Sequence, residues 1–485
     1  MKVLFILLFQ LLSVNAAASV SEARKIFNNS KDPHKNAHIA QELYKSKYYY
    51  SAVVFAKRHL IETSAYNEAL ENMLEKLILK TGTDNFTTLK GSILGKFPSP
   101  SLAFVYGIKL FKAQRYDEAK KRLSLVPLDH KFSPEARLTL GAIANIRNDQ
   151  KVMASEYKAC IEQADKKISD AGDNDKLARY FKILSDTCRI HMARSFYQNG
   201  KHEMAMTTYD QIAKTSYRWP YILVERAWTA YQMKDFNRAL GLGVTYKSPL
   251  LSSYFFPEAE VLSALSYYRL CLYDDALAKV EQFYEVYKPK ADELKALILP
   301  QKRSHKFFLE LALAPIKENE GKSPFIRQLL TQIRKKIIFN VDLVNYKRAI
   351  NENKYVVKLP NDYFGKTIRG ELKRMISFRT KKLNHFVKRL MFNFVNDIHA
   401  MSYEMFNIKL EIMSNKRDLV YKNKQLIADR GRGSYDNVSR KVEQQFYEFK
   451  GEFWADELGD YSFGLKSNCE TVKRQATEIT MRGAQ

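Results

Sequence analysis

A short pattern that returns through the first 290 residues constrains the fold more than any other feature of this sequence. Each copy has a small residue, then an aromatic residue or leucine three or four positions later, an aromatic residue about ten positions later, and an alanine. This pattern predicts a helical hairpin in which the small residue lets helix A approach helix B, the aromatic fills the turn and the alanine seats helix B. The four clearest copies are Gly107/Leu110/Phe111/Tyr116/Ala119, Ala193/Phe196/Tyr197/Gly200/Ala205, Ala227/Tyr231/Phe236/Ala239 and Ala264/Tyr267/Tyr273/Ala276.

The spacing of the copies predicts that the hairpins stack. Ala193 and Ala227 are 34 residues apart, Ala227 and Ala264 are 37 apart, and 34 residues again separate Gly107 from Gly141. A single hairpin cannot bury its apolar face alone, so neighbours must cover it. Two copies are degenerate: the Gly141 copy has Met153 in place of the alanine, and a weaker early copy contains Ala40, Tyr49 and Ala52. The 52 residues from Gly141 to Ala193 leave room for an extended helix or a loop.

Over roughly residues 35 to 290 these copies resemble the tetratricopeptide repeat family. The resemblance implies a right-handed superhelix whose concave groove, lined by the A helices, receives an extended peptide or a partner's helix. Aromatic and arginine side chains in such a groove are typical of binding hot spots, and the arginines could hold a carboxylate through two hydrogen bonds. The alternative is that the aromatic residues only pack between neighbouring helices. Transferred onto this register, the groove positions are Arg194, Tyr197, Tyr221, Trp228, Tyr231, Tyr268 and Arg269.

The repeat pattern ends at a helix break expected at Pro289. Residues 290–360 predict irregular basic helices separated at Pro300, Pro315 and Pro324, and then a short extended linker or edge strand in the segment KYVVKLP. Residues 361–430 predict long amphipathic helices, which should end at the glycine-rich RGRGS run.

A coiled-coil-like seam lies within these long helices, between residues 383 and 412. Its spacings of three and four residues indicate one apolar stripe, and one consecutive pair of fours departs from strict heptads. The stripe could pack within the chain or form a homodimer. Its members are Leu383, Val387, Leu390, Phe394, Ile398, Met401, Met405, Ile408 and Ile412.

The end of the chain, GEFWADELGDYSFGLKSNC, predicts a turn followed by a short strand. We expect its acidic residues Asp456, Glu457 and Asp460 to tie this segment onto the basic helices. Together with the repeats and an apparent leader, this ending is weakly similar to exported tetratricopeptide proteins of gliding and predatory bacteria. That resemblance implies a periplasmic location.

The predicted fold is therefore all-α: a tetratricopeptide-like solenoid followed by a helical, coiled-coil-like C-terminal domain with a possible short terminal strand. The expected segments are a signal peptide (1–18), N-terminal helices with one degenerate repeat (19–98), the repeat array (99–289), a basic helical linker region (290–360), long amphipathic helices (361–430) and a terminal turn and strand (431–485).

Export is expected from the N-terminus, where Lys2 precedes an apolar run from Val3 to Leu12 and a small-residue stretch, the layout of a cleavable signal peptide. An oxidising compartment permits disulfides, although four cysteines are too few for a disulfide scaffold. The best candidate pair is Cys160 with Cys188, because both should lie at one junction between repeats.

The charge of the chain points to an anionic partner. The net charge is +26, and residues 301–440 contain 30 lysines and arginines against 13 aspartates and glutamates. Export makes nucleic acid an improbable partner, so an anionic cell wall or membrane surface is the second functional hypothesis, beside a protein or peptide held in the groove. A solvated basic helix surface is the blander alternative.

No motif predicts catalysis, a cofactor or a metal. The sequence contains no HExxH, GxSxG, phosphate loop or dinucleotide fingerprint. The one pattern that could serve an enzyme is the acidic cluster near Trp454, since paired carboxylates cleave glycans. We therefore expect a non-catalytic interaction scaffold, with a glycan-cleaving enzyme as a remote third hypothesis.

Overall fold

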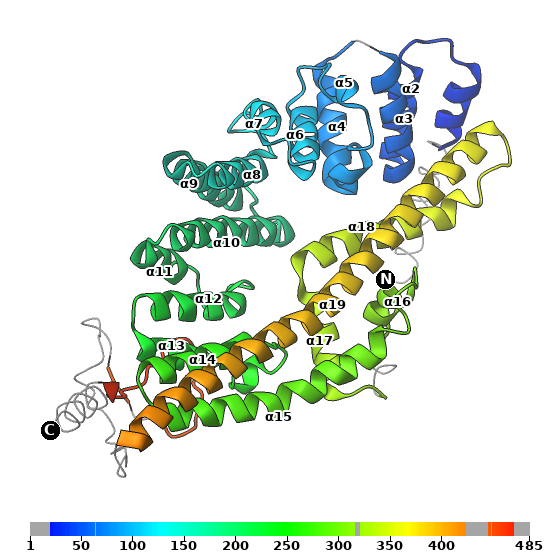
Figure 1. The fold of residues 1–485 in the computed structure, drawn as a ribbon. Coiled ribbons are helices and arrows are strands. Elements are labelled where there is room, and N and C mark those ends of the chain that lie inside the picture. The colour runs from blue at the N-terminus through cyan, green and yellow to red at the C-terminus, as the bar shows by residue number, and fades with distance from the viewer. Residues whose placement is uncertain (1–19, 64, 316–320, 423–444, 448, 470–485) are drawn as a thin grey trace, which may run out of the picture. The chain divides into compact units, whose positions relative to one another are not determined.

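The structure is a computed structural model that describes residues 20–63, 65–315, 321–422, 445–447 and 449–469. These residues form an all-α, solenoid-like fold (Figure 1). Contacts divide the chain into two compact units: unit 1 combines residues 1–188 with 336–385, and unit 2 combines residues 189–335 with 386–485. The predicted signal peptide and the RGRGS run lie outside the described residues.

Helical hairpins form at the predicted repeats. Residues 20–29 are helical, and α4 (Glu68–Thr81), the short 3-10 helix η1 (Thr83–Asn85) and α5 (Gly91–Leu94) separate the first hairpin from the second. The long helices α9 and α10 account for most of the wide gap between two repeats. The hairpins are α2 (Lys35–Lys45) with α3 (Tyr49–Glu62), α6 (Pro100–Lys112) with α7 (Tyr116–Leu123), α8 (Ser133–Ile146) with α9 (Gln150–Ser169), α10 (Asp175–Gln198) with α11 (His202–Asp210), α12 (Trp219–Gln232) with α13 (Phe236–Thr245), and α14 (Glu258–Arg269) with α15 (Tyr273–Ile298).

The turns of these six hairpins share one backbone feature. Each turn contains a residue with a positive φ, which reverses the chain directly after helix A. Only one of the six is glycine, so the turn geometry is imposed by the packing of the hairpin rather than chosen by the turn residue. The six residues are Lys47, Gln114, Asn148, Gly200, Lys234 and Cys271.

The small residues of the pattern do what their size predicts. A Cβ on Gly107 would lie 2.5 Å from Leu123 of the facing helix, and one on Gly141 would lie 2.6 Å from Tyr157. The helix B alanines Ala119, Ala205 and Ala276 are fully buried. Close helix approach therefore follows from these positions.

The structure corrects two expectations about the segment after the repeats. Pro289 does not break a helix, because α15 continues through it to Ile298 and buries Ala291 and Leu294 on its far side; this burial offsets the cost of a proline inside a helix, about 3 kcal/mol. The segment KYVVKLP is neither a linker nor a strand. It forms the end of α18 (Ile337–Val356) and a tight turn. In chain order, α16 (Phe307–Leu313) and α17 (Pro324–Lys335) follow α15 and precede α18.

One helix, α19 (Tyr363–Lys422), contains the predicted seam. In unit 2, Ile398, Met405, Ile408 and Ile412 are buried against α14 and α15, in a cluster that also contains Val261 and Phe283. The apolar stripe is thus covered within the chain, which is the first of the two alternatives. A homodimer through residues 383–412 finds no support.

The predicted terminal strand is wrong. Residues 461–468 have no regular secondary structure, and their backbone bonds to residues of the repeat helices. Phe463 N donates to the carbonyl of Asn237 (3.1 Å), and the Asn237 side chain both donates to Leu465 O and accepts from Leu465 N, each at 3.1 Å. We call residues 456–469 the strap. Asp460 of the strap pairs with Lys214 at 2.5 Å, so its acidic end is tied to the repeats and not to the basic C-terminal helices.

All four cysteines are in disulfides. Cys160 is bonded to Cys188 in unit 1, and both residues are fully buried. A second bond, which the sequence did not indicate, joins Cys271 in the turn between α14 and α15 to Cys469 at the end of the strap.

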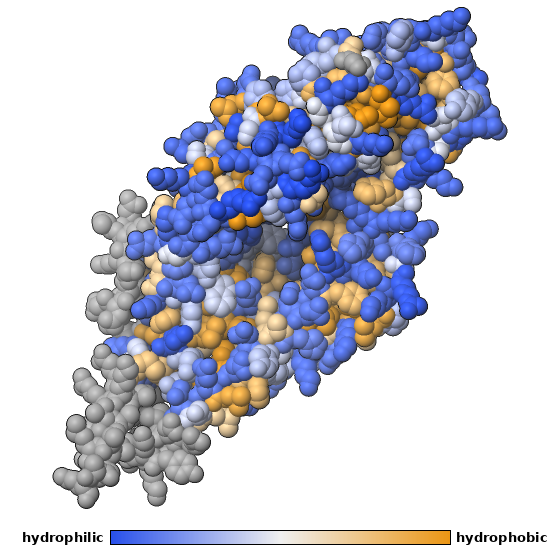
Figure 2. All heavy atoms as spheres, turned by 45° about the horizontal axis from the view of Figure 1, so that its top comes forward, coloured by the Kyte–Doolittle hydropathy of each residue, from blue (hydrophilic) through white to orange (hydrophobic). Residues whose placement is uncertain are grey.

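Among the described residues, no helix is long and apolar enough to cross a membrane. The face seen in Figure 2 is mainly hydrophilic, with hydrophobic patches scattered over it.

Candidate partner-binding face

The seven predicted groove residues all lie in unit 2, on the A helices of three consecutive hairpins. Arg194 and Tyr197 are on α10, Tyr221, Trp228 and Tyr231 on α12, and Tyr268 and Arg269 on α14. We call these seven residues the A-helix ladder. The structure connects most of them to the next A helix through polar contacts, so the ladder is partly an inter-repeat network and partly an open surface.

The first arginine of the ladder, Arg194, is already bound by a carboxylate of the chain. Arg194 Nε and Nη2 donate to the two carboxylate oxygens of Glu225 on α12, at 2.8 and 2.5 Å. Tyr209 donates its hydroxyl proton to the same carboxylate at 2.8 Å. Burial, reinforced by the negative charge of Glu225, raises the pKa of Tyr209 well above its usual value. The carboxylate that we expected from a partner is supplied to Arg194 by the chain itself.

Trp228 connects α12 to α14. Its indole N–H donates to Glu258 Oε1 on α14 at 2.6 Å, and its ring meets that of Tyr231 edge-on at 5.7 Å. Burial raises the pKa of Glu258, the Trp228 hydrogen bond lowers it, and the nearby carboxylates of Glu225 and Asp397 raise it further. The indole side chain is half-buried.

Tyr231 and Arg269 form a second contact between α12 and α14. Arg269 Nε donates to the Tyr231 hydroxyl at 2.9 Å, and this contact raises the pKa of Arg269. Arg269 is exposed and Tyr231 is half-buried. Tyr197 is also half-buried, and its hydroxyl accepts a long hydrogen bond of 3.5 Å from Gln232.

The two remaining residues have less access to a partner. Tyr221 lies in an aromatic cluster with Tyr217, Tyr254 and Phe256, at ring distances of 5.4 to 6.4 Å. Tyr268 is packed against α19, where Asn415 Nδ2 donates to its hydroxyl at 3.3 Å. The packing alternative therefore describes these two tyrosines.

Sequence reasoning did not identify Glu225 and Glu258, which bind Arg194 and Trp228. Glu225 lies three residues before Trp228 on α12, and this helical spacing is the local signal that could have placed it on the same face. Asn415 had no such signal, because its contact joins residues 147 positions apart.

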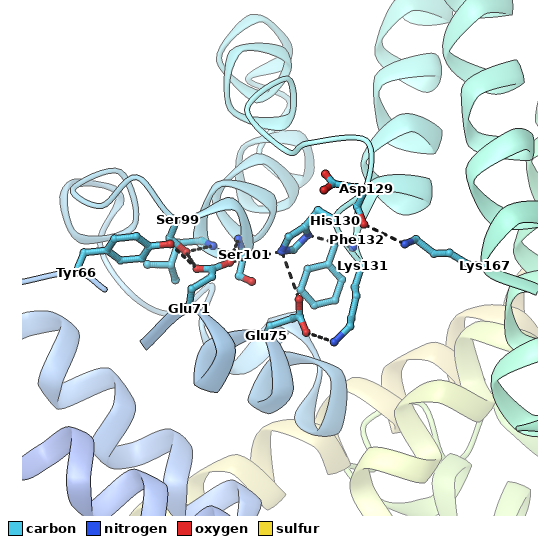
Figure 3. A network of polar contacts seen from close by, with 11 residues as sticks. Tyr66, Glu71, Glu75, Ser99, Ser101, Asp129, His130, Lys131, Phe132 and Lys167 are labelled. Atoms are coloured by element: carbon cyan, nitrogen blue, oxygen red, sulfur yellow. Dashed lines mark hydrogen bonds and ion pairs between the residues drawn. The ribbon is translucent and has the colours of Figure 1, made fainter. Parts of the chain in front are cut away.

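A second polar network lies in unit 1, around the carboxylate of Glu71 on α4 (Figure 3). Glu71 accepts hydrogen bonds from Ser99 Oγ (2.5 Å), Ser101 N (2.9 Å) and Tyr66 Oη (3.1 Å), and His130 Nε2 lies 3.5 Å from it. Burial alone would raise the pKa of Glu71, but the contacts with His130, Ser99 and Ser101 outweigh it and lower the pKa to about 2. Since Ser99 is the N-cap of α6, the network fastens α4 to the start of α6.

This network predicts a loss of stability in acid. A carboxylate whose pKa is depressed in the folded state stabilises it above its ordinary pKa, so that stabilisation should be lost as the pH falls from about 4.5 to about 2. Glu71→Gln should destabilise the α4–α6 junction by about 2 kcal/mol at pH 7, because a charged acceptor of several donors is removed. Hydrogen exchange of the α4 and α6 amides measures the effect. Glu68→Gln, an exposed position in the first turn of α4, is the matched control, and equal protection in both variants would contradict the assignment.

No group of three or more His, Cys, Asp or Glu side chains suited to a metal ion is found in the described part of the chain.

No family model matches the sequence, and no curated protein matches it. Among solved structures, the chain is similar to the apo form of RapI, with 11% sequence identity and a TM-score of 0.33 over 76% of this chain and 98% of RapI.

Proposed function

We propose that this chain is an exported, non-catalytic interaction scaffold of the periplasm, in which the A-helix ladder of unit 2 holds a helix or an extended segment of a partner protein. Envelope-associated complexes are the expected setting. The proposal rests on what the ladder already binds within the chain, on the residues it leaves accessible and on the state of the cysteines.

The observation that carries the proposal is the seating of α19 on α14 and α15. Ile398, Met405, Ile408 and Ile412 fill the apolar part of this contact, and polar contacts border it: Asn415 donates to Tyr268, and the Tyr284 hydroxyl donates to Ser402 O at 2.6 Å. An amphipathic helix laid into a helical groove is a common recognition mode. The last hairpin thus holds a helix of the kind that the earlier hairpins are proposed to take from a partner.

The accessible part of the ladder lies on α10, on α12 and at the end of α14. The Arg194 side chain is 44% exposed, Arg269 is exposed, and Tyr197, Trp228 and Tyr231 are half-buried. Tryptophan, tyrosine and arginine are the residues that most often dominate binding energy. The carboxylates of this face, Glu225 and Glu258, are engaged by Arg194, Tyr209 and Trp228, which favours a binding role over acid–base chemistry.

The cysteines support export. All four are paired in two disulfides, and such bonds persist in oxidising compartments and are rare in a reducing cytosol. The leader on which export was first inferred lies outside the described residues.

The test replaces the two ladder residues Tyr231 and Arg269. Partner proteins are captured by crosslinking in the native envelope and washing at high salt. The variant Tyr231→Ala/Arg269→Ala should capture them at least thirtyfold more weakly, because truncating hot-spot residues costs about 2 kcal/mol or more. Tyr403→Ala with Arg389→Ala removes an exposed aromatic residue and an exposed arginine of unit 2 outside the ladder, and should capture as the wild type does. Circular-dichroism melts establish that each variant is folded. Capture that survives in the ladder variant, or disappears from the wild type at high salt, would overturn the proposal.

A further inference from the structure

The turn between α18 and α19, defined here as residues 354–366, exposes three large apolar or aromatic side chains. Tyr355 is 60% exposed, Val357 55% and Tyr363 72%. The turn joins two long helices and is seen at the upper right of Figure 1, in yellow. The Tyr363 ring also lies 5.8 Å from that of Phe27, but most of the Tyr363 side chain faces solvent.

The charged residues of the turn are almost all positive. Lys354, Lys358 and Lys366 are exposed. The only acidic residue of the turn, Asp362, accepts hydrogen bonds from Gly365 N at 2.9 Å and from Arg24 Nε at 2.5 Å, and these lower its pKa. The turn therefore presents three cations while its one anion is already paired.

The acidic residues of α18 do not add to this surface. Asp342 is buried and pairs with Lys382 at 2.8 Å, and Glu352 is buried beneath α3. The exposed part of α18 that leads into the turn consequently carries no acidic side chain, and it includes Lys347 and Arg348.

The turn is held in one shape. Arg369 donates through Nη1 to Leu359 O at 2.7 Å and through Nη2 to Pro360 O at 3.3 Å and Asn361 Oδ1 at 3.0 Å. Gly365 lies so close to this backbone that a Cβ on it would be 2.1 Å from Pro360 O. A ligand that contacts the exposed side chains therefore need not order the turn, which lowers the cost of binding.

The size and chemistry of this surface favour a lipid bilayer over a protein. A stable protein interface buries about 800 Å² on each partner, more than one short turn offers. A bilayer instead rewards each inserted side chain separately, and tyrosine is suited to the level of the lipid headgroups. Each lysine near an anionic membrane strengthens binding about fivefold. A soluble polyanion would use the lysines but would gain nothing from Tyr355, Val357 and Tyr363.

We propose that the α18–α19 turn binds the surface of an anionic phospholipid bilayer, with Tyr355, Val357 and Tyr363 inserted at headgroup level and Lys354, Lys358 and Lys366 against the phosphates. This surface belongs to unit 1 and is independent of the A-helix ladder. It gives a defined location to an anionic-surface role that composition alone assigned to the whole basic C-terminal region.

Co-sedimentation with vesicles tests the proposal. The purified protein should bind vesicles of phosphatidylglycerol mixed with phosphatidylcholine at least tenfold more tightly than vesicles of phosphatidylcholine alone. Lys354→Gln/Lys358→Gln/Lys366→Gln should weaken binding to the anionic vesicles about 100-fold. Tyr355→Ser/Val357→Ser/Tyr363→Ser should weaken it at least tenfold while leaving binding to dextran sulfate, a soluble polyanion, unchanged.

A matched control uses three exposed apolar residues elsewhere in unit 1. Leu125→Ser/Leu128→Ser/Ile146→Ser removes side chains that are 50 to 58% exposed, and should bind anionic vesicles as the wild type does. Melting curves show whether the variants are folded, and partner capture through the ladder should be unaffected in all of them. Equal binding to both kinds of vesicle, or undiminished vesicle binding by the Tyr355/Val357/Tyr363 variant, would overturn the proposal.

Discussion

Replacing Glu352 with alanine should cost unit 1 about 3 to 5 kcal/mol, because this buried carboxylate on α18 caps the start of α3 from 300 residues away. It accepts hydrogen bonds from Tyr50 N at 2.9 Å, Ser51 N at 2.7 Å and Ser51 Oγ at 2.7 Å. The residue before α3, Tyr48, offers no side-chain cap of its own. The first N–H groups of a helix have no partner within it, so alanine would leave three buried donors unsatisfied.

The loss should be local to the contact between α3 and α18. Hydrogen exchange of the first α3 amides reports it directly, and it avoids treating two compact units as one cooperative transition. Glu118→Ala removes an exposed glutamate of α7 and should change stability by less than about 0.5 kcal/mol. Protection of the α3 amides as in the wild type would show that Glu352 does not cap this helix.

Glu352 also predicts how stability changes near neutral pH. Burial raises the pKa of Glu352 to about 7, although the hydrogen bonds from Tyr50 and Ser51 lower it. A raised carboxyl pKa means that the folded state binds the proton more tightly, so stability should fall as the pH rises from about 4.5 to about 7, by on the order of 3 kcal/mol. Glu71 acts in the opposite direction below pH 4.5, so the combined contribution of these two carboxyl groups to the stability of unit 1 should be greatest near pH 4.5. Glu352→Gln, which does not titrate, should remove the decline above that pH.

The repeats could be predicted because their determinants are local. Gly107 and Ala119 lie on the two helices of one hairpin, and both are there because backbones approach closely at these positions. The recurrence every 34 or so residues therefore reveals the hairpins before any long-range contact is known. The same reasoning placed the ladder residues on the A helices. It could not tell which of them would be bound by other residues of the same chain.

What could not be predicted depends on contacts between distant segments. Glu352 meets Ser51 across 301 residues, and Arg379 donates to Thr81 O across 298. Neither side chain differs in its local sequence from an ordinary helix residue. The amphipathic pattern of α19 predicted that this helix would bury a face, and left open against which helices.

The strap shows a second reason for failure. Its alternating Tyr461, Phe463 and Leu465 are typical of a strand, but a strand needs a neighbouring edge, and the described part of the chain offers none. The Asn237 side chain replaces a neighbouring strand, because it donates one hydrogen bond to the Leu465 backbone and accepts one from it. Gly241, one turn further along α13, leaves room for the strap backbone, since a Cβ there would overlap Tyr461 O.

The largest single stabilisation of unit 2 should come from the disulfide that ends the strap. The bond between Cys271 and Cys469 joins residues 198 positions apart, and loop closure of that length is worth up to about 5 kcal/mol by the chain-entropy relation. Cys469→Ser should therefore lower the stability of unit 2 by several kcal/mol and raise the rate at which proteases cleave residues 456–468. Gly241→Ala should loosen the same segment with the disulfide intact, because the added methyl group displaces the strap from α13.

The two disulfides should differ in their response to a dithiol reductant. Cys271 and Cys469 are half-buried, whereas Cys160 and Cys188 are fully buried, and a thiolate must reach a sulfur atom to exchange with it. Mild reduction followed by alkylation and mass spectrometry should label Cys271 and Cys469 first, together with release of the strap. In protein alkylated before any reduction, all four cysteines should be unlabelled, as the proposed export into an oxidising compartment predicts. Labelling of Cys160 and Cys188 first would contradict the predicted order of reduction. A strap equally protected in Cys469→Ser and wild type would show that the Cys271–Cys469 bond does not hold this segment to the repeats.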